Sequence, residues 1–562
     1  MPGAYALGLD FGTNSARALI VDCRTGEEIA TAVAGYAGGQ DGVLLDPRDP
    51  NVARQRPSDW LEAAERCTRA ALRSAAKVRG FRPEHVIGIG VDATASTPLP
   101  VDASGRALAD LPAFRRDLNA QAWLWKDHTA FAEAAEITAV AARRHPEYLA
   151  KCGGTYSSEW FWSKALRCLR VAPKVMKAAR YWVEQSDYIP AVLTGNGDPS
   201  TWKHNVCAAG HKAMYHESWS LPAADFFDLI DRRLGELRRQ GTFQKAFTSD
   251  TRAGDLCPAW ARRLGLPAGI PVAVGAIDAH LGAVGAGIRP GALVKILGTS
   301  SCDMMIHPND RPLRDIPGLC GIVDGSIVPG FFGLEAGQSA VGDIFNWWVN
   351  NFDKGERAHA ELSAKASRIP PGASGLLALD WNNGNRTVLV DPRLTGLLVG
   401  QTLHTTPAEV YRALVEGTAF GARVIMERLE EYGVEVREVI NCGGIAEKNP
   451  FVMQIYADVT GRPMRISRSA QTCALGAAIF GAVVAGRAAG GYDSVQAAQA
   501  KMCGLKKTVY RPDRRRHEVY NRLFALYRQL HDSFGTATYP RSPHNVMKDL
   551  LAIRDEARGL TR

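Results

Sequence analysis

The sequence lacks the features that mark several protein classes. Its eleven cysteines include no Cys-x-x-Cys pair and no zinc-finger spacing. An odd number of cysteines without such pairs is typical of a reducing compartment rather than of a disulfide framework. The pattern Gly-x-x-x-x-Gly-Lys-Ser/Thr is also missing, which excludes a P-loop nucleotide site.

Long apolar runs are missing as well. The longest one, Cys473 to Gly486, is too short to span a bilayer and predicts a helix of small residues packed inside a domain. The N-terminus has no charged segment, and Asp10 interrupts the first apolar stretch early, so no signal peptide is expected. We therefore expect a cytoplasmic protein without a membrane partner.

Positive charge is present but not concentrated. The net charge is +9, and the densest basic clusters are Lys506-Lys507 and residues 511–516. A nucleic-acid surface would gather such charges beside stacking aromatic residues, so we expect a solvated surface and no nucleic-acid partner. With 46% apolar and 22% charged residues, the chain has an ordinary globular composition, and 562 residues exceed a single hydrophobic core.

The first informative segment lies near the N-terminus. Apolar residues 5–9 and 16–21 flank Asp10 and the turn Gly12-Thr13-Asn14-Ser15, which predicts a β-hairpin. Gly12 permits close approach of a ligand, and the backbone N–H groups of the turn offer an anion-binding nest. Asp10 would repel a bare phosphate, so a divalent cation or a water molecule is expected between them. For this segment alone, a plain polar turn is the alternative.

A second copy of this layout covers residues 294–306, with Gly298-Thr299-Ser300 at its turn. When the two turns are aligned, Ile296 stands opposite Asp10, so only the first copy carries the carboxylate. Internal duplication predicts two domains of one fold, each presenting a phosphate-binding hairpin to a shared cleft.

Two other predicted strands end in polar residues. Apolar residues 86–91 lead into the small polar residues 92–97, and apolar residues 270–274 lead to Asp278, just before a helix that starts near His280. Ligands of open α/β sheets bind at the carboxyl ends of strands. We therefore expect Asp278 to lie where the two halves meet, with an N-cap role for that helix as the alternative.

With both hairpins, the chain resembles the FGGY family of sugar kinases, part of the actin/hexokinase-like ATPases, over about residues 5 to 500. It is most similar to the ribulokinase branch, since Thr94-Ala95 stand where glycerol-specific members have an Arg-Glu pair. The resemblance implies an α/β fold with two duplicated actin/hexokinase-like (ribonuclease H-like) domains flanking an interdomain active-site cleft. It predicts an N-terminal domain over residues 1–288, an ATP-binding C-terminal domain over 289–505 and a helical tail over 506–562.

The resemblance also implies roles for individual residues. Asp278 would be the catalytic base that takes the proton from the sugar hydroxyl, and Asp10 would bind the metal. Sugar-binding residues would be Thr94, Ala95, Trp125, Lys126, Asp127, Lys212, Asp278 and Glu335. Nucleotide-binding residues would be Gly12, Thr13, Asn14, Ser15, Arg17, Gly298, Thr299, Ser300, Gly342, Asn346, Gly443, Gly444, Lys448 and Asn449.

These assignments imply ATP-dependent phosphorylation of a ketopentose with Mg²⁺ as cofactor. L-ribulose is the expected substrate and L-ribulose 5-phosphate the product, as in L-arabinose degradation. Two alternatives stay open: an FGGY kinase for D-ribulose, xylulose or ribitol, and a non-catalytic actin-like sensor that binds ATP and sugar. The expected partners are small molecules, and a homodimer is a possible assembly.

Overall fold

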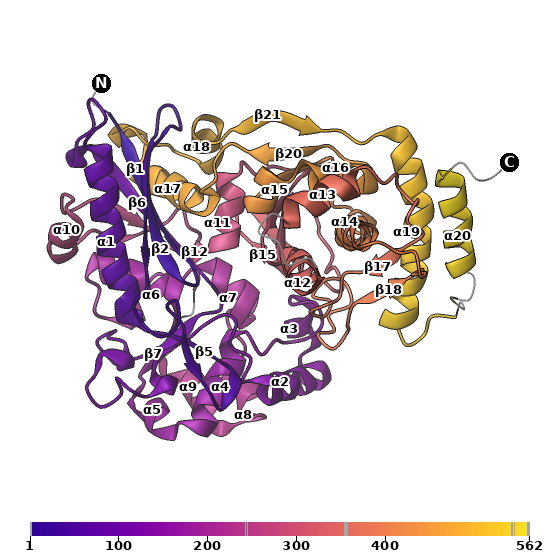
Figure 1. Ribbon diagram of the computed structural model, residues 1–562. Helices are drawn as coiled ribbons and strands as arrows, with labels where there is room; N and C mark the ends of the chain where they lie inside the picture. The colour runs from indigo at the N-terminus through magenta and orange to yellow at the C-terminus, as the bar shows by residue number, and fades with distance from the viewer. Residues whose placement is uncertain are drawn as a thin grey trace.

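The computed structural model describes residues 3–241, 243, 245–352, 358–540, 543 and 546–558. Two seven-stranded sheets form the cores of two halves of the chain (Figure 1). The first sheet has the order β10-β11-β6-β1-β2-β3, with β12 beside β6. Its strands are β1 (Tyr5–Phe11), β2 (Ser15–Asp22), β3 (Glu28–Gly35), β6 (Val86–Ala93), β10 (Arg252–Asp255), β11 (Pro271–Ala273) and β12 (Ala276–Ile277).

The second sheet has the order β15-β16-β14-β13-β19-β20-β21. Its strands are β13 (Ala292–Leu297), β14 (Ser301–Pro308), β15 (Gly321–Asp324), β16 (Phe331–Gln338), β19 (Glu438–Cys442), β20 (Met464–Ser467) and β21 (Leu505–Tyr510). The pairing repeats that of the first sheet: β1 is antiparallel to β2 and parallel to β6, and β13 is antiparallel to β14 and parallel to β19. The predicted duplication and both predicted hairpins are therefore confirmed.

Helices cover both faces of the first sheet. On one face, α1 (Pro57–Ala75), α6 (Gln185–Thr194) and α10 (Pro258–Leu264) share a hydrophobic core with β1, β2 and β6. On the other face, α11 (Asp278–Gly285) and α17 (Thr472–Ala485) lie in a core that also includes residues of the second sheet. Figure 1 shows these two helices between the sheets.

Glycines allow the close approach of α17. A Cβ at Gly8 or Gly90 would overlap backbone carbonyl groups of α17, and a Cβ at Gly476 of α17 would overlap that of Leu281 in α11. The run from Cys473 onward is thus a helix of small residues packed inside the protein, as predicted. Although α17 follows the second hairpin in the chain, it packs against the first sheet.

The rest of the first half forms a separate, largely helical layer with its own core. Trp123, Trp162 and Phe227 are among its buried residues. Its helices are α2 (Phe131–Arg144), α3 (Pro146–Ala150), α4 (Phe161–Val171), α5 (Pro173–Ala178), α7 (Val206–Ala213), α8 (Ala224–Asp228) and α9 (Arg232–Gly241). The remaining short strands of the first half are β4 (Leu44–Asp46), β5 (Asp49–Gln55), β7 (Pro98–Val101), β8 (Ala122–Trp123) and β9 (Tyr181–Glu184). Leu99 and Val101 of β7 belong to the core of the first sheet.

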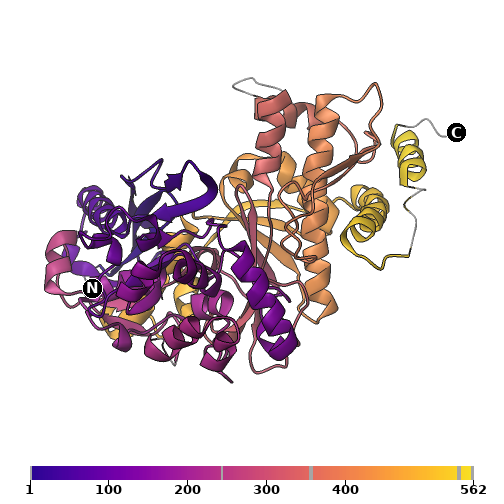
Figure 2. The same cartoon turned by 90° about the horizontal axis from the view of Figure 1, so that it is seen from below.

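The C-terminal segment is part of the second half. The tail predicted from residue 506 is not helical at its start, because β21 pairs antiparallel with β20. The helix α19 (Arg514–Gly535) then buries Tyr520 and Tyr527 in the second core, beside α14 (Pro407–Glu431) and α16 (Pro450–Thr460). Figure 2 shows α19 and α20 (Val546–Ala557) on the second half, away from the first. Residues 541–542, 544–545 and 559–562 of the predicted tail lie outside the described residues.

Within the described residues, no helix combines the length and apolar character that crossing a membrane requires.

Candidate active site

Three aspartates meet at the carboxyl ends of three neighbouring parallel strands. Asp10 of β1 is in register with Asp92 of β6, and Asp92 is in register with Ala276 of β12. Asp278 follows β12 directly, as the first residue of α11. This is the edge at which open α/β sheets bind ligands.

The surroundings of Asp278 favour a proton acceptor. Burial raises the pKa of Asp278 to about 7, and the nearby Asp10 carboxylate acts in the same direction. The Oδ1 atom accepts a hydrogen bond of 2.6 Å from the backbone N–H of Ala279. The N-cap position of α11 belongs to Ile277, so capping does not explain Asp278. A carboxyl group whose pKa lies near neutral pH suits general-base catalysis.

Asp10 and Asp92 form the inner part of this cluster. Burial raises the pKa of Asp10, although Nη1 of Arg17 donates to its Oδ2 at 3.0 Å. Asp92 is fully buried, and among the described residues its carboxylate has no donor partner, apart from a proton that it could share with Asp10. Burial, Asp10 and Asp278 raise the pKa of Asp92 well above its usual range. The sequence interpretation assigned no role to Asp92, although it ends an apolar strand just as Asp10 does.

The first hairpin, residues 10–17, is held by side chains of the helical layer. The N–H of Gly12 closes the turn on the carbonyl of Ser15 at 3.0 Å. Nε1 of Trp125 donates to Oγ1 of Thr13 at 3.0 Å, and Nε2 of Gln55 donates to the Thr13 carbonyl at 2.7 Å. Trp125, predicted to bind sugar, therefore lies against the phosphate hairpin.

The second hairpin, residues 296–303, is held by the backbone of α12 (Gly342–Phe352). The N–H of Gly342 donates to the Gly298 carbonyl at 3.0 Å, and the N–H of Val341 donates to the Thr299 carbonyl at 2.8 Å. A Cβ at Gly342 would lie 2.5 Å from the Gly298 carbonyl oxygen. Gly342 is thus required for this approach and is brought next to the hairpin, as predicted for one nucleotide site.

The Gly443-Gly444 turn lies beside the same hairpin. Gly443 has a φ of +93°, and a Cβ there would overlap the carbonyl of Leu297. A Cβ at Gly444 would find no heavy atom within 4 Å, so a ligand can approach its bare backbone. The structure therefore brings the second hairpin, Gly342 and this turn together.

Other predicted nucleotide residues lie at the edge of this group. Asn346 is exposed, and its Oδ1 lies 2.9 Å from Nε2 of His359. Lys448 is exposed at the end of α15 (Gly444–Lys448). Asn449 is the N-cap of α16, and its Oδ1 accepts a bond of 3.3 Å from the N–H of Val452. These contacts explain the capping asparagine without a nucleotide.

A buried ion pair joins the two halves. Nζ of Lys212 on α7 donates to both carboxylate oxygens of Glu335 on β16, at 2.9 and 3.0 Å. Burial favours the neutral form of Glu335, but Lys212, with smaller contributions from His211 and His280, outweighs burial and holds the pKa of that carboxyl well below its usual range. Two predicted sugar-binding residues, more than a hundred positions apart in the chain, are therefore in contact.

Two buried imidazoles adjoin this pair. Nδ1 of His211 and Nε2 of His280 lie 3.4 and 3.6 Å from Oε2 of Glu335. Burial lowers the pKa of His280 to about 4 and that of His211 well below its usual range. The ligand atoms of these three residues lie within 4.8 Å of one another, a set that could hold a metal ion. Because Lys212 already neutralises Glu335 and the low pKa values leave both imidazoles neutral, we interpret the cluster as the Lys212–Glu335 ion pair flanked by two neutral imidazoles.

Two predicted sugar-binding residues are buried and form hydrogen bonds within the protein. Asp127 is fully buried, forms an ion pair with Arg54, and accepts hydrogen bonds from the N–H of Ala53 at 2.7 Å and from Oγ1 of Thr129 at 2.6 Å. It has no oxygen left for a sugar, which corrects that prediction. Thr94 is also buried, and its hydroxyl lies 2.9 Å from that of Thr97. Ala95 and Lys126 beside them are partly exposed.

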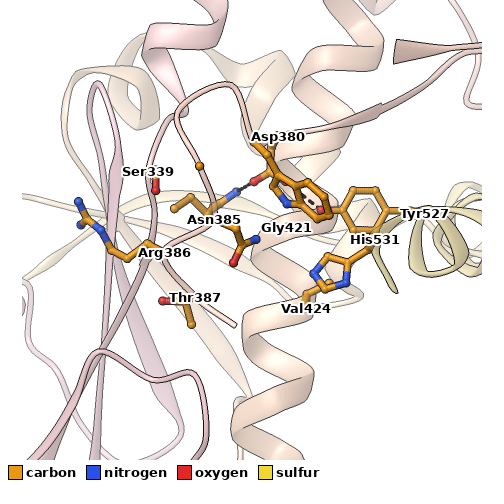
Figure 3. A pocket seen from close by; sticks show the side chains of 12 residues that line it. Ser339, Asp380, Asn385, Arg386, Thr387, Gly421, Val424, Tyr527 and His531 are labelled. Atoms are coloured by element: carbon orange, nitrogen blue, oxygen red, sulfur yellow. Dashed lines mark hydrogen bonds between the residues drawn. The ribbon is translucent and has the colours of Figure 1, made fainter. Parts of the chain in front are cut away.

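A buried polar network links the second hairpin to helix α19. Nζ of Lys295 donates to Oγ of Ser301 at 3.0 Å and to Oε1 of Gln338 at 2.9 Å. Nε2 of Gln338 donates to Oδ2 of Asp380 at 2.7 Å, and the Tyr527 hydroxyl donates to Oδ1 of Asp380 at 2.8 Å. We call these five residues the tail network. Figure 3 shows Asp380 and Tyr527 at a cavity of about 10 Å³, large enough for about one water molecule.

Comparisons with known proteins agree with this geometry. The models for the N-terminal and C-terminal domains of the FGGY family of carbohydrate kinases match residues 5–285 and 293–485. A ribulokinase from Halalkalibacterium halodurans is 40% identical over 573 residues, which cover 99% of this chain and 98% of that protein. A ribulokinase from Vibrio parahaemolyticus is 42% identical over 548 residues, covering 94% of this chain and 95% of that protein.

A solved structure shares the fold as well. The xylulose kinase from Rhodospirillum rubrum superposes with a TM-score of 0.76 at 25% identity, covering 95% of this chain and all of that one. The duplicated α/β architecture with actin/hexokinase-like topology is therefore confirmed. Since the two domain models together match most of its length, the chain belongs to the FGGY family of carbohydrate kinases.

Proposed function

We propose that this kinase transfers the γ-phosphoryl group of ATP to L-ribulose and forms L-ribulose 5-phosphate. The relatives named ribulokinase, which align over nearly the whole chain, support this substrate. The observation that carries the proposal is the position of Asp278 at the junction of the halves, close enough to Asp10 and Glu335 to be influenced by both charges.

Each part of the site has a task in this reaction. The attacking sugar hydroxyl gives its proton to Asp278 while its oxygen bonds to the γ-phosphorus, and the bond to the β–γ bridging oxygen of ATP breaks. The two hairpins offer backbone N–H groups to the phosphates. Lys212 and Glu335 offer donors and acceptors to the sugar hydroxyl groups.

The inner carboxylates fit a divalent cation. Asp10 and Asp92 place two buried carboxylates side by side, an arrangement that like-charge repulsion disfavours unless a cation or a proton lies between them. Mg²⁺ is commonly held by one or two carboxylates together with substrate phosphates. We propose that Asp10 binds this Mg²⁺ ion. The bound ion would neutralise negative charge on the ATP phosphates.

The test is sugar-dependent release of ADP by the purified chain. L-ribulose, D-ribulose, D-xylulose, ribitol and glycerol are compared at equal concentration with Mg-ATP. The proposal predicts the highest kcat/KM for L-ribulose. A higher value for another acceptor would identify a different FGGY kinase, and no release with any acceptor would favour the sensor alternative. A cytoplasmic location and a homodimer stay predictions.

A further inference from the structure

Arg386 lies on a loop whose backbone is held on both sides. The loop joins β17 (Leu377–Leu379) to β18 (Leu397–Val399). Before Arg386, the N–H of Asn385 donates to the carbonyl of Asp391 at 2.9 Å, and the reverse bond measures 3.0 Å. After it, Oγ1 of Thr387 accepts a bond of 3.1 Å from the N–H of Gly337. Gly337 is two residues from Glu335 on β16, so Arg386 is anchored beside the acceptor-side ion pair.

The guanidinium group of Arg386 has no hydrogen-bond or ion-pair partner among the described residues. Figure 3 shows its side chain pointing away from Tyr527 and His531. Arg393 on the same loop differs, because its Nε donates to Oδ1 of Asp391 at 3.2 Å. A partly buried cation without a partner loses hydration and gains no bond in return. Five N–H donors on a fixed loop are therefore free for a ligand.

The charges around Arg386 indicate what kind of ligand. Burial lowers the pKa of Arg386, but Glu159, the thiols of Cys302 and Cys320, and Glu335 together outweigh burial and raise it. Lys212 is the other nearby cation, as its own pKa responds to Arg386. Asp278 also lies within electrostatic reach of Glu335 and Lys212, so the carboxylates at least balance the two cations. This place therefore suits a neutral polyhydroxy ligand better than a phosphate dianion.

Lys212 by itself offers few hydrogen-bond donors to the acceptor sugar. Two of its three N–H groups are directed to Glu335. We propose that Arg386 is a ligand of the acceptor sugar and donates hydrogen bonds to the oxygens of a polyhydroxy ketone. This inference rests on the proposed function, since it concerns the same acceptor site.

The test compares Arg386→Ala with the matched control Arg393→Ala in the full chain. Binding of L-ribulose and of Mg-ATP is measured separately by titration calorimetry. Because hydrogen bonds to a charged group are strong, Arg386→Ala should weaken L-ribulose binding by about 10- to 100-fold. Binding of Mg-ATP should stay within twofold, and the control should bind both ligands as the wild type does. Arg386 lacks a protein partner, so the melting temperature without ligand should not fall.

A second variant and a rescue experiment test the same role of Arg386. Arg386→Gln replaces the guanidinium with a shorter, uncharged amide donor and should also bind L-ribulose more weakly than the wild type. Added guanidinium ion should partly restore sugar binding to Arg386→Ala but not change the wild type. Unchanged sugar affinity in both variants would overturn the proposal, as would a loss confined to Mg-ATP. If the wild type prefers another acceptor from the panel, the substrate proposal fails, and the same comparison with that acceptor still tests Arg386.

Discussion

The two hairpins share a backbone and differ in the side chains behind it. In the first half, the parallel strands β1 and β6 pair Asp10 with Asp92. In the second half, the equivalent strands β13 and β19 pair Ile296 with Cys442. The duplicated fold thus supplies two sets of backbone N–H groups. Among the described residues, only the first set adjoins a pair of carboxylates on neighbouring parallel strands, whereas Asp303 of the second hairpin is paired with Lys295. We propose that this difference allows the first copy to serve a cation and the acceptor as well as phosphate, while the second serves the nucleotide alone.

The supports of the hairpins differ in the same way. The first hairpin is held by the side chains of Trp125 and Gln55 from the helical layer. The second is held by backbone N–H groups of α12 and, through Ser301, by the tail network. If these differences matter, substitutions in the two halves should affect cation, sugar and nucleotide binding unequally.

The largest effect is expected from Asp278→Asn. The amide keeps the size of the side chain but cannot accept the proton, so kcat should fall by about 10²–10⁴-fold with sugar affinity little changed. Steady-state kinetics and sugar titration measure the two quantities. Retention of kcat within about tenfold would show that another group is the base.

The pH profile of the wild type provides a check on this assignment. Because the pKa of Asp278 is raised to about 7, kcat/KM should rise with pH through that value as the carboxylate form appears. The same shift means that the folded state holds this proton more tightly than the unfolded chain, so this contribution to stability is lost as pH rises from about 4 to 7. A profile that is flat near pH 7 would contradict the assignment.

Asp10→Asn tests whether cation binding depends on the first hairpin and not on the second. Affinity for Mn²⁺ in the presence of nucleotide, measured by electron paramagnetic resonance, should fall by about 10- to 100-fold, as is typical when metal sites lose a supporting group. The matched change Ile296→Asn in the second hairpin should leave Mn²⁺ affinity within a few-fold. Equal losses in both variants would contradict a division of roles.

Gly298→Val tests the second hairpin as a nucleotide site. A Cβ at Gly298 would approach the protein no closer than 3.9 Å, at the carbonyl of Ser300, so the substitution should leave the fold intact. Its branched side chain would stand where phosphates approach, and Mg-ATP affinity should fall by about tenfold, near 1.4 kcal/mol. Sugar binding measured by calorimetry should persist. Loss of both ligands together with a lower melting temperature would point to a folding defect instead.

The smallest effect concerns the tail network. Tyr527→Phe removes a hydrogen bond from Asp380, and Tyr520→Phe, on the same helix, removes one from Glu416. Each leaves a buried carboxylate short of a donor, at a cost of about 1–3 kcal/mol of unfolding free energy. Only Tyr527→Phe should also raise KM for ATP by a few-fold, since only Tyr527 connects through Gln338 to the second hairpin. Equal KM values in the two variants would confine the tail to a stabilising role.

Local patterns in the sequence determined the hairpins, their duplication, the small-residue helix and the position of Asp278. These features depend on strand periodicity, turn residues and chain order, which neighbouring residues set among themselves. Only the tertiary structure showed that Asp92 lies beside Asp10 and that Arg54 forms an ion pair with Asp127. It also showed that, among the described residues, Arg386 has no hydrogen-bond or ion-pair partner. Each of these depends on strand register or on contacts between segments far apart in the chain. A residue's type does not reveal whether its hydrogen bonds are satisfied within the protein or remain free for a substrate.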